Sequence, residues 1–420
     1  MANSIVKYSN DSNDTSNDTL ETTTTVSPPL VIDLYYGGKV VTDMLEQNKY
    51  LLCEITKKDL KLTDSMITED AIADADDEHD AKNKGSKKKK KKTKTSKTVG
   101  MSRKERQWYH VQQSSCNDSR SDNVILDRDY LHKVMAESVY PYHFIDFETI
   151  APVLPFTVDK HPYEPIAFQF SHHILHEDGT TTQHATQFLL TTPGVCPNIH
   201  FLNAISDTFQ NQYTTGTIFR WGSHENTILR SIYANTIDEI ERPSVRSMER
   251  FFGTGFTDDE HQDSGDGIIQ DGMVDLMSII SKGYYVNGSN GSTSIKSLLL
   301  PTLQYSTHLR DLYEAPNYNS TNFTNMQWWM ESEVGNGRPI DPYKLLQTAN
   351  VDNIDTNISP ASICSVVAHG GDAIAAYSTL QRKDIERNAR QQIEKSLLRY
   401  CELDTLAMVM IMQALIGHLK

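Results

Sequence analysis

Apolar residues of this chain gather in short runs after residue 101, and the spacing of those runs predicts alternating strands and helices. Runs in which apolar residues recur at every second position are typical of strands, because successive strand side chains point to opposite faces. Glu177–Gly179 carries the residues of a tight turn and predicts a hairpin. The strands predicted in this way are Tyr142–Phe147, Ile166–Ser171 with its continuation His173–Leu175, Ala185–Leu190 and Gly216–Trp221.

Other runs repeat every three to four residues, which is the spacing of one helix face. Ser223 is a predicted N-cap, and Pro301 is predicted to stop a helix because proline lacks the backbone N–H. Gly253–Gly272 and Asn317–Ile358 read as loops or insertions. The predicted helices are Arg103–Gln113, Tyr130–Met135, Phe201–Phe209, Ser223–Tyr233, Gly272–Ser281, Ser294–Leu299, Ser365–Leu380 and Asp384–His418.

The order of these elements predicts the fold class. Three antiparallel strands come first, followed by a helix, a further strand and more helices. Such an order is typical of α/β domains with a mixed sheet. We expect a ribonuclease-H-like sheet, with three antiparallel strands plus parallel strands, flanked by helices.

Composition divides the chain into four parts. Residues 1–29 are rich in Asn, Ser, Thr and Asp and predict a disordered tail, since they offer few groups to bury. Residues 30–65 predict a small strand-like or mixed segment, and residues 101–420 the main domain. Residues 66–100 run from an acidic block into six lysines, Lys87–Lys92, and predict a disordered linker. The alternatives for the lysines are a nuclear-import signal or a phosphate-binding arm.

The net charge of −15 argues against a protein that covers nucleic acid with a broad basic surface. It leaves room for an enzyme that holds phosphates through metal ions and a local basic rim. The five cysteines form no C-x-x-C pair, so a disulfide framework and a zinc site are both disfavoured. No signal peptide is predicted, and the apolar stretch Leu406–Gly417 is too short to span a bilayer. We therefore expect an intracellular protein, cytoplasmic or nuclear, with no membrane partner.

Two short motifs near opposite ends of the domain carry the candidate chemistry. Asp146 and Glu148 end an apolar strand and lie on one side of it. Tyr400 and Asp404 are one helical turn apart on one face. Each motif alone is also explained without a function, as a strand end that reaches solvent or as a core tyrosine with a bonded hydroxyl. Together they offer the three carboxylates and the phenol that a two-metal phosphodiesterase needs.

A fourth acid is expected from the middle of the chain, just after a strand. Glu225 occupies that place, although a carboxylate in a first helical turn is also favoured by the helix dipole. Asp275 is a competing candidate for the same role.

Asp-x-Glu, a central acid and Tyr-x-x-x-Asp together resemble the tyrosine-containing branch of the DEDD exonuclease superfamily. More closely, residues 101–420, about three quarters of the chain, resemble the bacterial family called domain of unknown function 2779. The chain departs from the wider superfamily in having Glu225 where aspartate is usual. It also has no counterpart of the upstream nuclease region often seen in that family. The matching stretches are Tyr142–Thr149, His161–His172, Trp221–Leu229, Val274–Ile279, Gly291–Pro301, His369–Tyr377 and Arg399–Val409.

The resemblance implies a ribonuclease-H-like fold and metal-dependent 3′–5′ exonuclease chemistry. Two Mg²⁺ or Mn²⁺ ions would bind Asp146, Glu148, Glu225 and Asp404, because hard cations prefer oxygen ligands. Tyr400 would orient or deprotonate the attacking water.

The expected substrate is the single-stranded end of DNA or RNA. Arg220, His224 and Lys296 are candidates for contacts with its phosphates, and Phe147 for a contact with its terminal base. The rival hypothesis is a catalytically weak or inactive module on the same fold that binds nucleic acid or protein. A third is a nucleic-acid binder that uses the arm Lys87–Lys97.

Overall fold

The computed structural model describes residues 28–62, 100–114, 122–158, 160–236, 243–253, 272–333, 337–351 and 367–420. Almost all of the predicted tail, residues 1–29, lies outside these ranges, as does the predicted linker 66–100 apart from Gly100.

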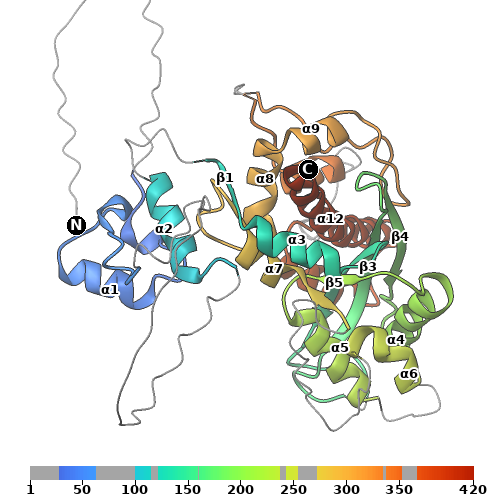
Figure 1. Ribbon diagram of the computed structural model, residues 1–420. Coiled ribbons are helices and arrows are strands. Elements are labelled where there is room, and N and C mark those ends of the chain that lie inside the picture. The colour runs from blue at the N-terminus through green and yellow to red at the C-terminus, as the bar shows by residue number, and fades with distance from the viewer. Residues whose placement is uncertain are drawn as a thin grey trace, which may run out of the picture.

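A five-stranded mixed sheet organises the main domain (Figure 1), in the order β4-β3-β2-β5-β6. The first three strands along the chain pair antiparallel, as predicted, and β5 and β6 run parallel to β2. The described residues also contain a two-stranded antiparallel ribbon, β1 with β7, which was not predicted. The strands are β1 (Val124–Leu126), β2 (Tyr142–Ile150), β3 (Ile166–Leu175), β4 (Thr182–Leu189), β5 (Ile218–Arg220), β6 (Val274–Asp275) and β7 (Tyr284–Val286).

Helices cover both faces of this sheet (Figure 1). The long helix α12 (Arg387–Leu419) packs along one face, where Tyr142, Phe144 and Ile150 of β2 join its core. The opposite face carries Ile145 and Phe147 of β2 and is covered by the α4–α6 group. The strand alternation therefore sends even-numbered β2 residues toward α12. The α4–α6 group is α4 (Asn198–Asp207), α5 (His224–Ala234) and α6 (Val245–Phe252).

The remaining helices of the main domain lie outside the α4–α6 group. They are α3 (Arg128–Glu137), α7 (Leu276–Gly283), α8 (Ile295–Tyr305), α9 (Thr307–Tyr313), α10 (Pro342–Val351) and α11 (Gly370–Leu380).

The small N-terminal segment is helical rather than strand-like. It contains α1 (Gly38–Glu46), and its strand-like part is an isolated bridge between Leu30 and Leu51. Its apolar side chains form a separate small core with Val111 of α2 (Arg103–Ser114). Of the two alternatives for this segment, strand-like or mixed, the structure favours the mixed one, because apolar runs this short do not separate a strand from a helical turn.

Three predicted boundaries are wrong for identifiable reasons. The segment predicted as the helix Gly272–Ser281 begins as strand β6, and the helix starts only after Asp275, which caps it by accepting from the Ser278 N–H. Helix α8 continues through Pro301, because the buried side chains on this helix outweigh one missing hydrogen bond. The segment Asn317–Ile358, predicted as a loop, contains α10.

Two predicted helix starts also need correction. Ser223 stands at the N-cap position of α5, but its side chain makes no capping hydrogen bond; instead its backbone carbonyl accepts from the Thr227 N–H. Helix α11 starts after His369, whose ring nitrogen accepts from the Asp372 N–H. The predicted start at Ser365 lies outside the described residues.

By length and composition, α12 could cross a membrane, but 89% of its most apolar window is buried inside the protein. That burial is the pattern of a core helix and is consistent with a soluble protein. The helix predicted over Asp384–His418, which contains the apolar stretch Leu406–Gly417, corresponds to α12.

Candidate functional site

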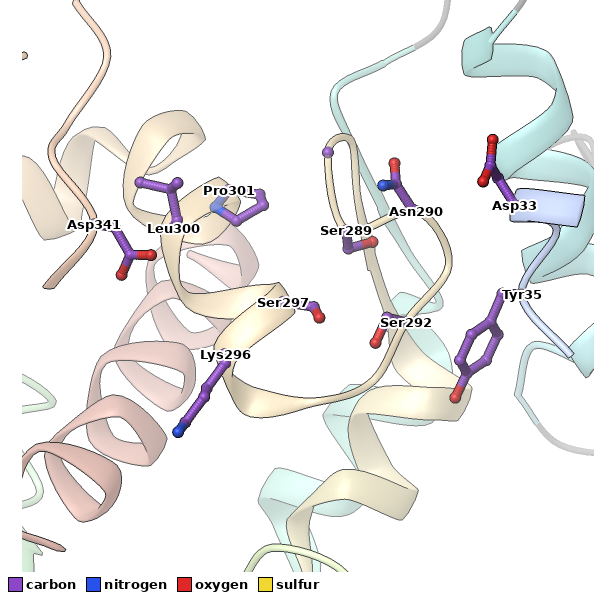
Figure 2. A pocket seen from close by; sticks show the side chains of 11 residues that line it. Asp33, Tyr35, Ser289, Asn290, Ser292, Lys296, Ser297, Leu300, Pro301 and Asp341 are labelled. Carbon is purple, nitrogen blue, oxygen red and sulfur yellow. The ribbon is translucent and has the colours of Figure 1, made fainter. Parts of the chain in front are cut away.

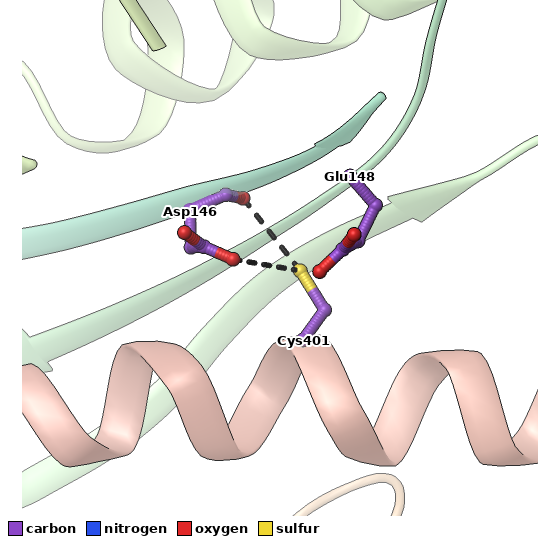
Figure 3. A group of neighbouring side chains, drawn as sticks. All are labelled: Asp146, Glu148 and Cys401. Carbon is purple, nitrogen blue, oxygen red and sulfur yellow. Dashed lines mark hydrogen bonds between the residues drawn. The ribbon is translucent and has the colours of Figure 1, made fainter. Parts of the chain in front are cut away.

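Strand β2 and helix α12 bring the two predicted motifs face to face. Asp146 and Glu148 point toward α12, because they share the strand face of Tyr142 and Phe144. Figure 3 shows the sulfur of Cys401, from α12, between their carboxyl groups. One ligand atom from each of Asp146, Glu148 and Cys401 lies within 4.8 Å of the other two. This three-residue group, which we call the β2–α12 cluster, is the centre of the candidate site.

Asp404 lies one helical turn after Tyr400 and is 7% exposed. Its Oδ1 accepts a short hydrogen bond from the Tyr343 hydroxyl of α10. Asp404 lies outside the β2–α12 cluster, yet its charge raises the pKa of both Asp146 and Glu148. The fold therefore brings the two terminal motifs into one electrostatic site.

Glu225 approaches the same site from the first turn of α5. It is 3% exposed, and its Oε2 has no hydrogen-bond partner among the described residues. Burial raises its pKa to about 7, although Arg220 opposes the shift. A buried carboxylate oxygen without a donor is costly unless a proton or a cation meets it.

Asp275, the competing central acid, is already engaged. Its carboxylate accepts from the Ser278 N–H at the start of α7 and from the Gly222 N–H at 2.9 Å. Asp275 thus fixes the turn that leads into α5, and its negative charge raises the pKa of Glu225. Of the two candidates, Glu225 is the one whose charge acts on both Asp146 and Glu148.

All four carboxyl groups have raised pKa values. For Asp146 and Glu148 the main cause is burial, followed by the charge of Asp404. Burial also raises the pKa of Asp404, against the effects of Lys296 and Tyr343. Cations placed among these groups would remove the like-charge repulsion that burial makes expensive.

Lys296, from the first turn of α8, is the cation next to the acids. Its Nζ donates to the Tyr400 hydroxyl at 3.0 Å and to the Ala368 carbonyl at 3.0 Å. It also lies over the Tyr400 ring, 4.7 Å from its centroid. Burial, followed by the charge of Asp404, raises the pKa of Tyr400. The Tyr400 hydroxyl therefore keeps its proton near neutral pH.

Of the residues predicted to contact substrate, Phe147 lies away from the acids, whereas Arg220 and His224 lie at the end of β5 and at the start of α5. Phe147 is buried on the opposite face of the sheet, 4.9 Å from the Phe201 ring centroid, so the prediction that it contacts a base is wrong. Arg220 ends β5 and has two guanidinium nitrogens, Nε and Nη1, without partners among the described residues. His224 Nε2 hydrogen-bonds the Thr149 hydroxyl at 2.9 Å, at the end of β2.

Two functional neighbours were missed from the sequence. Tyr343 lay in a segment predicted as a loop, and its bond to Asp404 spans 61 positions, which no local pattern reveals. Cys401 was set aside because it belongs to no cysteine pair. Its position three residues before Asp404 was the available signal, since positions i and i+3 share a helix face.

A cavity of about 470 Å³ lies beside Lys296, between α8 and the N-terminal segment. Figure 2 shows Tyr35 and Asp33 on one side and the loop and helix that carry Ser289, Ser292 and Ser297 on the other. The Tyr35 hydroxyl lies 3.1 Å from the Thr293 hydroxyl, which ties the two walls together. The lining is rich in hydroxyl and amide groups, with Lys296 at one end.

Comparison with known families supports the resemblance to domain of unknown function 2779 over part of the chain. A family model described as "Domain of unknown function (DUF2779)" matches residues 143–294. This segment contains Asp146, Glu148 and Glu225, whereas Tyr400 and Asp404 lie beyond it. No curated protein and no solved structure matches the chain.

Proposed function

We propose that this chain hydrolyses phosphodiester bonds in nucleic acid with divalent metal ions, as a 3′–5′ exonuclease with a two-metal mechanism. The observation that carries the proposal is the meeting of four buried or half-buried carboxyl groups from β2, α5 and α12. One of them, Glu225, has a buried oxygen without any donor among the described residues. A cluster of this kind suits hard divalent cations better than it suits a metal-free core.

The sheet supports the same proposal. Its three antiparallel strands followed by two parallel ones are the strand directions expected of a ribonuclease-H-like fold. Asp146 and Glu148 lie on the central strand, and Glu225 follows the strand next to it. The acids are thus held by strands and helices and not by loops, which favours a precise metal site.

The residues fit two Mg²⁺ or Mn²⁺ ions. Asp146, Glu148, Glu225 and Asp404 would hold them, and Glu225 Oε2 is the oxygen that most needs a cation. When bound, such ions stabilise the attacking and leaving oxygens of an in-line displacement.

Other residues of the chain would handle the water and the phosphate. Tyr400 orients the attacking water through its hydroxyl; its raised pKa makes it a hydrogen-bond partner and not a base. Lys296 fixes that hydroxyl, and the unpartnered nitrogens of Arg220 supply positive charge for the phosphate. The cavity beside Lys296 offers room for the neighbouring nucleotide.

The direct test is degradation of end-labelled single-stranded DNA and RNA by the purified full chain in Mn²⁺. Loss of label from the 3′ end first would establish the direction of attack. Asp146→Ala and Asp404→Ala should abolish cleavage, while Asp384→Asn, at an exposed acid that pairs with Arg382, should not. Equal rates for all four proteins would rule the proposal out.

Two observations favour the rival function, a binding module without catalysis. Asp404 already has a donor, Tyr343, and Lys296 partly offsets the charge of the acids. Calorimetric titration with Mn²⁺ separates the two functions, because the binding module predicts no metal binding and nucleic-acid binding that survives Asp146→Ala.

A further inference from the structure

The β2–α12 cluster contains a sulfur atom at a position where an all-oxygen site would have none. Cys401 is fully buried, and its Sγ lies 3.6 Å from the Asp146 carbonyl oxygen and 3.8 Å from Asp146 Oδ2. Figure 3 shows that the sulfur points toward the two carboxyl groups and not along α12. The thiol therefore shares the space in which a cation would bind.

The separation of Cys401 Sγ and Asp146 Oδ2, across which the thiol donates a hydrogen bond, also fits two ligands of one metal ion. Zinc binds thiolate sulfur at about 2.3 Å and carboxylate oxygen at about 2.1 Å, so two such ligands stand about 3.6 Å apart in tetrahedral geometry. The observed 3.8 Å between Cys401 Sγ and Asp146 Oδ2 matches this edge. One ligand atom of Glu148 lies within 4.8 Å of both, which completes a three-ligand face.

A further carboxylate oxygen near the cluster is available to bind a cation. Glu225 Oε2 is buried and without a partner among the described residues, and the charge of Glu225 acts on both Asp146 and Glu148. Three donors with one more nearby are what a zinc-sized cation uses. A sulfur donor adds preference for softer cations, since thiolates select Zn²⁺ and its heavier relative Cd²⁺ over Mg²⁺.

We propose that Cys401 is a metal ligand beside Asp146 and Glu148, so that this site binds Zn²⁺ or Cd²⁺ through a thiolate. On binding, the metal–sulfur bond replaces the S–H bond, and the proton passes to solvent. Mg²⁺ and Mn²⁺ bind through the oxygens alone. This inference rests on the proposed function, since both concern one site. It adds a regulatory consequence: Zn²⁺ competes with the activating ions and inhibits hydrolysis.

The test is a titration of the metal-free full chain with Cd²⁺, followed through the ultraviolet charge-transfer band that a sulfur–cadmium bond produces. The band should appear in the wild type and in Cys53→Ser and Cys196→Ser, and should be absent in Cys401→Ser. Cys401→Ser should weaken Cd²⁺ binding about 10-fold or more. Its Mn²⁺ affinity should change by less than about twofold, because serine leaves the oxygen ligands in place.

A measurement on the wild type alone covers the case in which Cys401→Ser does not fold. Zinc that displaces bound Mn²⁺ should show one sulfur neighbour at about 2.3 Å by X-ray absorption. A cadmium band that persists in Cys401→Ser, or zinc with oxygen neighbours only, would overturn the role of Cys401 while Mn²⁺ binding keeps the proposed function intact. If the wild type binds neither Mn²⁺ nor Cd²⁺, the metal site itself is wrong, and the proposed function falls with it.

Discussion

Helix α12 carries two acids at positions 402 and 404 that lie in opposite kinds of environment. Glu402 is 0% exposed, and both of its oxygens have donors: the Tyr318 hydroxyl at 2.6 Å and the Asn322 side-chain amide at 2.6 Å. His184 Nδ1 lies 3.4 Å from the same carboxylate. Asp404 instead faces the acids of β2, and its charge raises the pKa of both Asp146 and Glu148.

The network around Glu402 extends through hydroxyl and imidazole groups. His173 bonds the Tyr318 hydroxyl at 2.9 Å and the Thr405 hydroxyl at 2.7 Å, and Ser171 bonds Thr405 at 2.8 Å. A buried network of this kind strengthens itself and rigidifies the core. The comparison teaches that burial of an acid does not by itself indicate a metal site. A group of acids that face one another, as Asp404 and the two acids of β2 do, is the better indicator.

The largest expected effect is the loss of cleavage activity on substitution of Asp146, without a loss of folding stability. Asp146→Asn should lower the rate of Mn²⁺-dependent cleavage about 10³-fold or more, because an amide cannot replace a charged metal ligand. The same change should leave the metal-free protein equally or more stable, since it removes one member of a repelling group. Single-turnover cleavage and urea unfolding measure the two effects. A variant that loses activity only because it unfolds at lower urea would contradict this reading.

Substitution of Glu402 is expected to have the opposite result, a large loss of folding stability. Glu402→Leu should destabilise the protein by about 3–5 kcal/mol, because Tyr318, Asn322 and His184 all lose their acceptor. Urea unfolding measures the change, with Glu402→Gln as the matched control that retains one acceptor oxygen. A loss below about 1 kcal/mol would show that the network does not hold the core together.

The pH dependence of stability gives a third test, through Glu225. Its folded pKa is about 7, above the unfolded value of about 4, so between these values the folded state holds a proton that the unfolded state has released. Folding stability from this group is therefore greatest below about pH 4 and falls as the pH rises through 7.

Glu225→Gln removes that dependence and serves as the comparison. In metal-free buffer, the free energy of unfolding of the variant minus that of the wild type should grow by about 3 kcal/mol between pH 4 and pH 8. Saturating Mn²⁺ should reverse the difference, because the metal binds the charged wild-type carboxylate. A difference that stays constant with pH would mean that Glu225 keeps an ordinary pKa.

The smallest effect is expected from Tyr343→Phe. It removes one hydrogen bond to Asp404 and leaves the ring in place, so cleavage should slow by about 10-fold, the usual cost of a bond to a charged group. The substrate KM should stay within about twofold, because Tyr343 positions Asp404 and does not bind the phosphate. Tyr313→Phe, which removes a similar bond to Gln413 elsewhere on α12, is the control. If cleavage slows equally in Tyr343→Phe and Tyr313→Phe, the slowing comes from a general change in the packing of α12 and not from the bond to Asp404.

The sequence predicted the elements with strong periodicity and failed where local patterns compete. The strands around β2 and the long C-terminal helix were found because their burial repeats are long. Strands β6 and β7, of two and three residues, are too short to show any repeat. Helix α8 was cut short at Pro301, since local propensity gives no measure of how well a helix is packed.

The sequence by itself determined that Asp146 and Glu148 share one face of β2, because alternation along a strand is a local property. It also determined that Tyr400 and Asp404 share a helix face, since their spacing is one turn. Only the tertiary structure decided the rest: that the charge of Glu225 and not of Asp275 acts on the acids of β2, that Phe147 belongs to the opposite core, and that Cys401 and Tyr343 join the site. Hydrogen-bond partners, burial and distances between remote segments exist only once the chain has packed, and these quantities distinguish a structural acid from a reactive one.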